Sequence, residues 1–215
     1  MAAAAALLLA GCGVGQVGAA AVVGQQAIST SEVDAVASAL CSAQSGNGTS
    51  TSKLPSRGAR QGALQALLAA EVARQFGHSL GLHANQAKVA ESLANDRLGI
   101  QSLPADEQDA FRQALKVYAE GRLMLAQVGR KALEAQGQKK ISQKQAIAAG
   151  VQKEGDFAKK LDVEVDPRFG QFHNGTLVAR SGSLSVPVSS TAHSGAKAQP
   201  SAEWVSSLPR SQLCG

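Results

Sequence analysis

The residues at the start of the chain are the ones best suited to covalent chemistry. Cys12 follows Leu9, Ala10 and Gly11 and closes an apolar run that begins almost at Met1. Small residues before a scissile bond fit a narrow protease pocket, and a thiol directly beyond them is a natural acceptor for a thioether-linked diacylglycerol. The run is shorter than the roughly 20 residues of a membrane span but suits the apolar part of a signal peptide. The pattern predicts export and acylation of Cys12.

Leu9-Ala10-Gly11-Cys12 resembles the lipobox of bacterial lipoproteins. The resemblance implies that residues 1–11 are a signal peptide and that Cys12 carries diacylglycerol and a further acyl chain such as palmitate. The mature chain would then lie on the extracytoplasmic face of the cell membrane. No Lys or Arg follows Met1, so the basic region of a signal peptide is missing, and we expect the true start codon to lie upstream. The alternative is a short hydrophobic tail with an incidental buried cysteine.

Two cysteines remain once Cys12 is assigned to lipid. Cys41 and Cys214 lie at opposite ends of the expected folded region. An extracytoplasmic compartment permits disulfides, and an even remainder fits one bridge. We predict a disulfide between them, which requires Cα atoms within about 7 Å, with two unpaired thiols as the alternative.

Other patterns that could do chemistry are weak. Gly13-x-Gly15-x-x-Gly18 matches a dinucleotide fingerprint but lacks a strand before it and a long helix after it. His78 and His83 have no further ligands clustered nearby, so we expect loop histidines rather than zinc ligands. No Gly-x-Ser-x-Gly, His-Glu-x-x-His or phosphate-binding loop occurs. We therefore expect no enzyme, no catalytic residue, no cofactor and no metal.

Composition points to a mostly helical domain. The chain has 215 residues, 44% of them apolar and only 3% aromatic, with a net charge of +5. Abundant Ala, Leu, Gln, Ser and Gly indicate helices packed through small residues. Basic residues are mixed with acidic ones and aromatic stacking positions are scarce, so nucleic acid is not an expected partner.

The clearest helix signal lies at Ser29. Ser29 and Glu32 form a capping box, and Ile28 and Val33 occupy the positions of a hydrophobic staple. The helix is expected to end near Gln44. Its apolar stripe, which places Cys41 at the core or its edge, comprises Val33, Val36, Ala37, Leu40 and Cys41.

Four more helices are expected downstream. Ser45–Arg60 is rich in Ser, Thr and Gly and predicts a loop without core residues. The first helix after the loop is expected to end at Gly77, and its apolar face comprises Leu64, Leu67, Leu68, Val72 and Phe76. The second is expected over Ala84–Asp96, and the third from Ala105 to about Gln136, where Gly137 ends it. The fourth starts at a capping box of Ser142 and Gln145. Gly121 and Gly129 inside the third indicate a kink or a close helix contact.

Short extended segments lie on both sides of the helices. Ala20–Val23 precedes them, and Leu161–Asp166 alternates with period two until Pro167 stops it. Leu184, Val186 and Val188 alternate again around Pro187 and predict an edge strand. Ser189–Ala202 is of low complexity and is expected to be disordered, after which Trp204 and Leu208 would anchor the last turn.

The order of these elements resembles the actinobacterial lipoproteins with a SurA-like N-terminal domain, of the trigger factor/SurA chaperone superfamily. The resemblance rests on Ile28-Ser29-x-Ser31-Glu32-Val33-Asp34 and on Val165-Asp166-Pro167-Arg168-Phe169-Gly170. It implies a SurA N-terminal-like helical domain over residues 20–172, after a signal peptide (1–11) and a flexible tether (12–19). Residues 173–215 are expected to form an extended, partly disordered tail that returns to the domain.

The resemblance implies a membrane-anchored, chaperone-like module that binds unfolded or nascent exported polypeptides through an apolar groove between helices. Too few residues follow Pro167 for a parvulin domain, so isomerase activity is not implied. The alternative is a non-catalytic cell-envelope lipoprotein with one dedicated protein partner.

Overall fold

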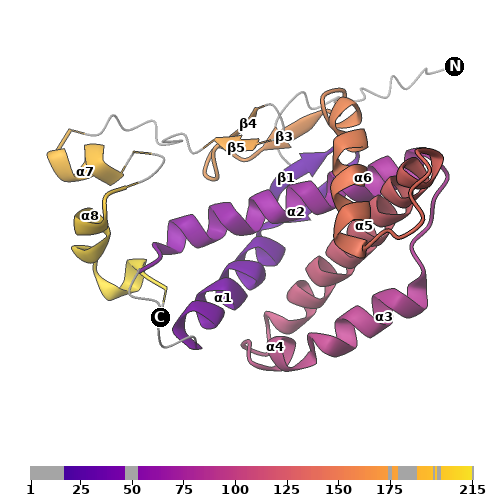
Figure 1. Cartoon of the computed structure of the whole chain (residues 1–215). Coiled ribbons are helices and arrows are strands. Elements are labelled where there is room, and N and C mark those ends of the chain that lie inside the picture. Colours follow the sequence, from indigo (N-terminus) through magenta and orange to yellow (C-terminus); the bar gives the residue numbers. More distant parts are fainter. Residues whose placement is uncertain are drawn as a thin grey trace, which may run out of the picture.

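The structure is a computed structural model that describes residues 17–46, 53–173, 176–178, 188–195, 197 and 200–214 (Figure 1). The predicted signal peptide and Cys12 lie outside these residues. The helices are α1 (Thr30–Gly46), α2 (Ser56–Ser79), α3 (Gln86–Asn95), α4 (Arg97–Gln101), α5 (Gln108–Ala135), α6 (Gln143–Ala158), α7 (Ser190–Gly195), α8 (Ala202–Ser206) and the 3-10 turn η1 (Arg210–Gln212). The strands are β1 (Ala19–Val23), β2 (Gln26–Ser29), β3 (Val163–Val165), β4 (Gln171–His173) and β5 (Thr176–Val178). The mostly α class is confirmed.

A small sheet joins the two ends of the helical region. Its strand order is β2-β1-β3, and both pairings are antiparallel, with Val22 opposite Glu164. Both extended segments that flank the helices in the sequence are therefore present, and they pair with each other. Ala20 and Val23 of β1 are fully buried because α2 packs over the sheet.

The start of α1 has the predicted geometry. The Ser29 backbone N–H donates to the Glu32 carboxylate at 2.8 Å, and the Glu32 N–H donates to the Ser29 hydroxyl at 3.1 Å. Ile28 and Val33 are both buried. The capping box and the staple are confirmed, and they fix the direction in which α1 leaves β2.

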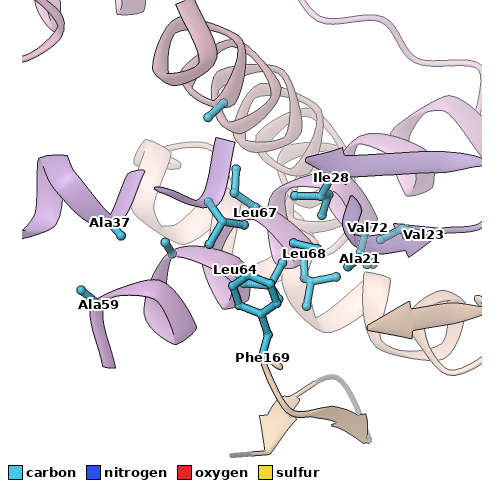
Figure 2. Close-up of a cluster of buried hydrophobic side chains, with 14 residues drawn as sticks. Ala21, Val23, Ile28, Ala37, Ala59, Leu64, Leu67, Leu68, Val72 and Phe169 are labelled. Atoms are coloured by element: carbon cyan, nitrogen blue, oxygen red, sulfur yellow. The ribbon is translucent and has the colours of Figure 1, made fainter. Parts of the chain in front are cut away.

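The core forms around α2 (Figure 2). Leu64, Leu67, Leu68 and Val72 pack with residues of β1, β2 and α1 and with Phe169, which follows β3. The sequence prediction of a loop through Arg60 is wrong at its end, because α2 begins at Ser56 and Ala59 is buried. The first turn of α2 is polar apart from this one alanine, so no apolar period marked it.

Two predicted helix-ending glycines have different roles. Gly77 does not end α2: a side chain there would collide with Met124 of α5, so this glycine allows close packing. The helix ends at Ser79, where Gly81 has a φ of +68° and its N–H donates to the His78 carbonyl at 2.9 Å. Gly137, with a φ of +83°, ends α5 as predicted.

The glycines inside α5 make close helix contacts. A Cβ atom on Gly121 would lie 2.6 Å from the Ala70 carbonyl oxygen of α2. A Cβ on Gly129 would overlap the Ala146 carbonyl of α6, and one on Gly150 would overlap the Leu125 carbonyl of α5. Of the two alternatives from the sequence, close contact is the one observed.

Part of the C-terminal segment that the sequence predicts to be disordered forms a helix in the structure. Ser190–Gly195 forms α7, which packs against α8 and accepts a hydrogen bond of 2.8 Å from the Trp204 indole N–H to the Thr191 carbonyl. Leu184 and Val186 of the predicted edge strand lie outside the described residues, and Val188 is exposed. The sequence showed no apolar period in this stretch, and the observed helix is short and held mainly by Trp204.

The chain ends against the body of the domain. Cys214 forms a disulfide with Cys41 of α1, with an S–S distance of 2.03 Å and a Cα separation of 4.8 Å. The Cys214 N–H also donates to the Leu54 carbonyl at 2.8 Å, and Leu213 pairs with Pro55. The C-terminus is thereby attached where α1 ends and α2 begins. Within the described residues, no helix is both long enough and apolar enough to cross a bilayer.

Candidate functional site

A groove of about 1010 Å³ runs along α5. In Figure 1, α6 crosses α5 and α3 lies to one side of α5. The groove is lined by α3, α5 and Gln143 at the start of α6. Its floor is the α5 strip that contains Ala119, Leu123 and Ala126. The remaining lining residues are His83, Asn85, Lys88, Glu91, Ser92, Asn95, Asp96, Tyr118, Arg122, Gln127, Arg130 and Gln143.

The contact between α3 and α5 explains why space remains here. Val89 of α3 packs against Ala119 and Met124 of α5, with Leu93 and Leu123 beside them. α3 has only ten residues, begins at an Asn85 cap and continues directly into the turn that starts α4. One short helix therefore covers part of α5 and leaves the strip toward α6 open.

The groove is more polar than the sequence analysis predicted. Only the floor is apolar, whereas the α3 wall consists of amide, hydroxyl and charged side chains. The predicted apolar groove is therefore present only in part, as an apolar floor between polar walls. The apolar residues of α3, Val89 and Leu93, pack against α5 and do not line the hollow.

Two arginines on the floor helix are held by neighbouring groups. Arg122 donates to the Tyr118 hydroxyl at 2.9 Å, and its guanidinium lies 5.4 Å from the centre of the Tyr118 ring. Arg130 donates to the Ile141 carbonyl at 3.2 Å. A second hollow of about 430 Å³ continues the groove toward Lys144 and Ile147, because Tyr118, Arg122 and Gln143 line both.

The other ionisable groups of interest belong to the framework. Buried Glu71 pairs with Arg74 at 2.9 Å, and this hydrogen bond raises the pKa of Arg74 above its ordinary value. Gln75 donates both to Glu71 and to the Val23 carbonyl, each at 2.8 Å, and so ties α2 to β1. Burial raises the pKa of Glu154 on α6 from 4.5 to about 7. None of these side chains lines the groove.

The residues singled out from sequence are dispersed. Cys12 lies outside the described residues, and Cys41 and Cys214 are joined away from the groove. The ring centres of His78 and His83 lie 6.0 Å apart, and both side chains are exposed. His83 lies in a loop as expected, whereas His78 belongs to the last turn of α2, which extends past Gly77 to Ser79. The described part of the chain contains no group of three or more His, Cys, Asp or Glu side chains arranged to hold a metal. Of the residues singled out, His83 lines the groove. Tyr118, Arg122 and Arg130 were missed as groove residues because they occupy ordinary positions of a long helix.

Comparison with known proteins assigns the domain. A family model described as SurA-like N-terminal domain matches residues 2–116, which is more than half of the chain. The chain belongs to this family. The SurA-like N-terminal domain is a chaperone-type, non-catalytic domain, and SurA-like domains in general bind unfolded polypeptides. The match ends inside α5, so this SurA-like chain continues beyond the matched region through α6 and β3. No significant match was found among curated proteins or solved structures.

Proposed function

We propose that this protein is a membrane-anchored, extracytoplasmic lipoprotein that holds unfolded or partly folded polypeptides in the groove along α5. The observation that carries the proposal is an open groove of about 1010 Å³ on a domain of a chaperone-type family. The protein would act as a holdase, without an isomerase step.

The lining of the groove suits an unfolded chain. Such a chain offers both apolar side chains and unpaired backbone amides. Leu123 and Ala126 would cover the apolar groups, whose removal from water is favourable. Amide side chains such as Asn85 and Asn95 would pair with the backbone, so that polar groups of the client are not left unsatisfied. Binding of this kind is weak and reversible and needs no nucleotide.

The anchor is a separate part of the proposal. A lipid on Cys12 would hold the domain at the membrane surface, with the described fold beginning shortly afterwards at Val17. More than one acyl chain is needed for stable anchoring, which is what a lipoprotein cysteine carries. Membrane fractionation of full-length protein tests this: Cys12→Ala should move the protein out of the salt-resistant membrane fraction. Retention of the variant in that fraction would contradict the lipid anchor.

The holdase activity is tested by filling the groove. Ala126→Trp places a large ring on the floor, whereas Ala66→Trp places the same ring on an exposed position of α2 that does not line the groove. We expect the first variant to lose suppression of client aggregation, measured by light scattering, and the second to keep it. Several unrelated unfolded proteins should serve as clients. Protection of a single client would favour a dedicated partner, and no protection by the wild type would refute the holdase.

A further inference from the structure

We infer that the groove prefers an extended polypeptide segment that carries two carboxylate side chains about four residues apart. The inference rests on the proposed function and specifies the substrate class of that site. It follows from the distribution of charge along the groove, from the two arginines of α5 and from their spacing.

Positive charge is concentrated on one side. Arg122 and Arg130 lie on α5, and Lys144 lies at the start of α6 in the adjoining hollow. The opposite wall, formed by α3 and the residue that caps its end, carries one basic and two acidic side chains, Lys88, Glu91 and Asp96. None of these six groups forms an ion pair within the described part of the chain. The α5 and α6 side therefore presents cations that form no ion pair within the described part of the chain.

The two arginines are already ordered. Arg122 is held by the Tyr118 ring and hydroxyl, and Arg130 by the Ile141 carbonyl. A guanidinium has five N–H donors, so each arginine retains donors for an incoming carboxylate. Because part of the side-chain entropy has already been lost, less is lost on binding. Planar, bidentate pairing with carboxylates is the geometry for which arginine is best suited.

The spacing defines the ligand. Arg122 and Arg130 are eight residues apart on one helix, which is about 12 Å along the axis at 1.5 Å per residue. An extended chain rises about 3.3 Å per residue, so four residues cover nearly the same distance. Side chains separated by four residues also point to the same face of an extended segment. The side chain midway between the carboxylates would then meet Ala126, which leaves room for an apolar group.

Three labelled peptides of equal length test the inference by fluorescence anisotropy with full-length protein. The first carries Glu residues four apart around a central Leu, the second carries the same residues with the two Glu adjacent, and the third has Gln in place of Glu. We expect the first to bind about five- to tenfold more tightly than the other two, and the preference to fall as salt is raised. The double variant Arg122→Gln/Arg130→Gln should abolish the preference.

A matched control separates the site from general charge. Lys116→Gln/Lys131→Gln removes the same charge from exposed positions of α5 that do not line the groove, and it should retain the preference. Equal binding of the spaced and adjacent peptides, or of the Glu and Gln peptides, would overturn the inference and leave the holdase proposal standing. Failure of every peptide to bind would refute both. Self-association of the protein that depends on Arg122 and Arg130 would instead make a second copy the occupant.

Discussion

The two sides of α5 use opposite ways of packing. Gly121 brings the α5 backbone into direct contact with α2, and Gly129 brings it into contact with α6. Gly150 of α6 makes the same kind of close contact with the α5 backbone. Toward α3, Val89 and Leu93 meet α5 through side chains, and a groove of about 1010 Å³ remains. One helix thus has a closed side and an open side.

The difference shows how a domain with few aromatic residues can combine a tightly packed helix interface with a groove that is open to a ligand. Close backbone contact compensates for small side chains because it brings many atoms within van der Waals distance. Such a contact tolerates no added volume, whereas the open side has room for it. Substitutions on the two sides of α5 should therefore differ in their effect on stability.

The largest effect is expected from adding a methyl group to the closed side. Gly129→Ala would drive a Cβ atom into the Ala146 carbonyl, and backbone cannot move aside as a side chain can. We expect the free energy of unfolding to fall by about 3 kcal/mol, measured by denaturant titration.

Gly155→Ala is the matched control for that substitution. Gly155 lies on α6, and an added Cβ would meet nothing within 4 Å. Alanine should therefore stabilise the helix by up to about 1 kcal/mol. Similar losses from both substitutions would mean that α6 is not held to α5 by close contact.

The next effect is a pH dependence from Glu154, one turn beyond Gly150 on α6. This half-buried carboxyl has one oxygen, Oε1, that accepts no hydrogen bond from the described residues, and burial raises its pKa from 4.5 to about 7. Between these values the folded protein binds a proton that the unfolded chain has released. The contribution of Glu154 to the free energy of unfolding should therefore be fully present below pH 4.5 and be lost as the pH rises through about 7.

The expected loss across this range is about 1–2 kcal/mol, after allowance for the solvent that reaches the group. Glu154→Gln should remove this part of the pH dependence, seen as a difference between variant and wild-type stability curves. If the two stability curves stayed parallel from pH 4 to 8, the carboxyl of Glu154 would be accessible to solvent and its pKa would not be raised in the folded protein.

A smaller effect is expected at the start of α6, which borders the groove. The Ser142 hydroxyl accepts a hydrogen bond from the Gln145 N–H at 3.3 Å, and the Gln145 side chain accepts one from the Ser142 N–H at 2.9 Å. Ser142→Ala should lower stability by about 1 kcal/mol and loosen the first turn, measured by amide hydrogen exchange. Unchanged exchange in residues 143–146 would show that packing on α5 alone fixes this wall.

The smallest effect on stability is expected on the open side. Ala126→Trp should change the free energy of unfolding by no more than about 0.5 kcal/mol, because the added ring enters the groove and displaces no packed atoms. Thermal unfolding measures this. A loss comparable to that of Gly129→Ala would mean that the open side is as tightly packed as the closed one.

Local signals in the sequence predicted much of the fold. Both capping boxes, at Ser29 and Ser142, are formed by the predicted partners. Gly121 and Gly129 indicate a kink or a close helix contact, since glycine in a helix interior is unfavourable without such a reason, and the structure shows the contact. These features depend on residues within a few positions, or on one residue type, and are therefore visible in a single chain.

The short elements and the groove were not predictable in this way. Arg97–Gln101 of α4 is too short for an apolar period, and the hairpin of β4 and β5 depends partly on Gln65 of α2, which accepts a hydrogen bond from the Leu177 N–H. The groove arises from how far α3 extends along α5. The positions of Tyr118 and Arg122 in the sequence carry no mark of it.

The disulfide between Cys41 and Cys214 spans 173 positions of the chain and turns nearly the whole domain into a covalent ring. A protease that cuts once within this ring, for example in the connection between α5 and α6, would produce two ends but no separate pieces. The nicked protein would gain only the mass of one water, and both parts would stay linked to β1 and β2 until a reductant reached the bridge. If the protein works outside the reducing cytosol, as proposed, one cleavage would leave its parts joined, and the fragments would separate on a denaturing gel only after thiol treatment.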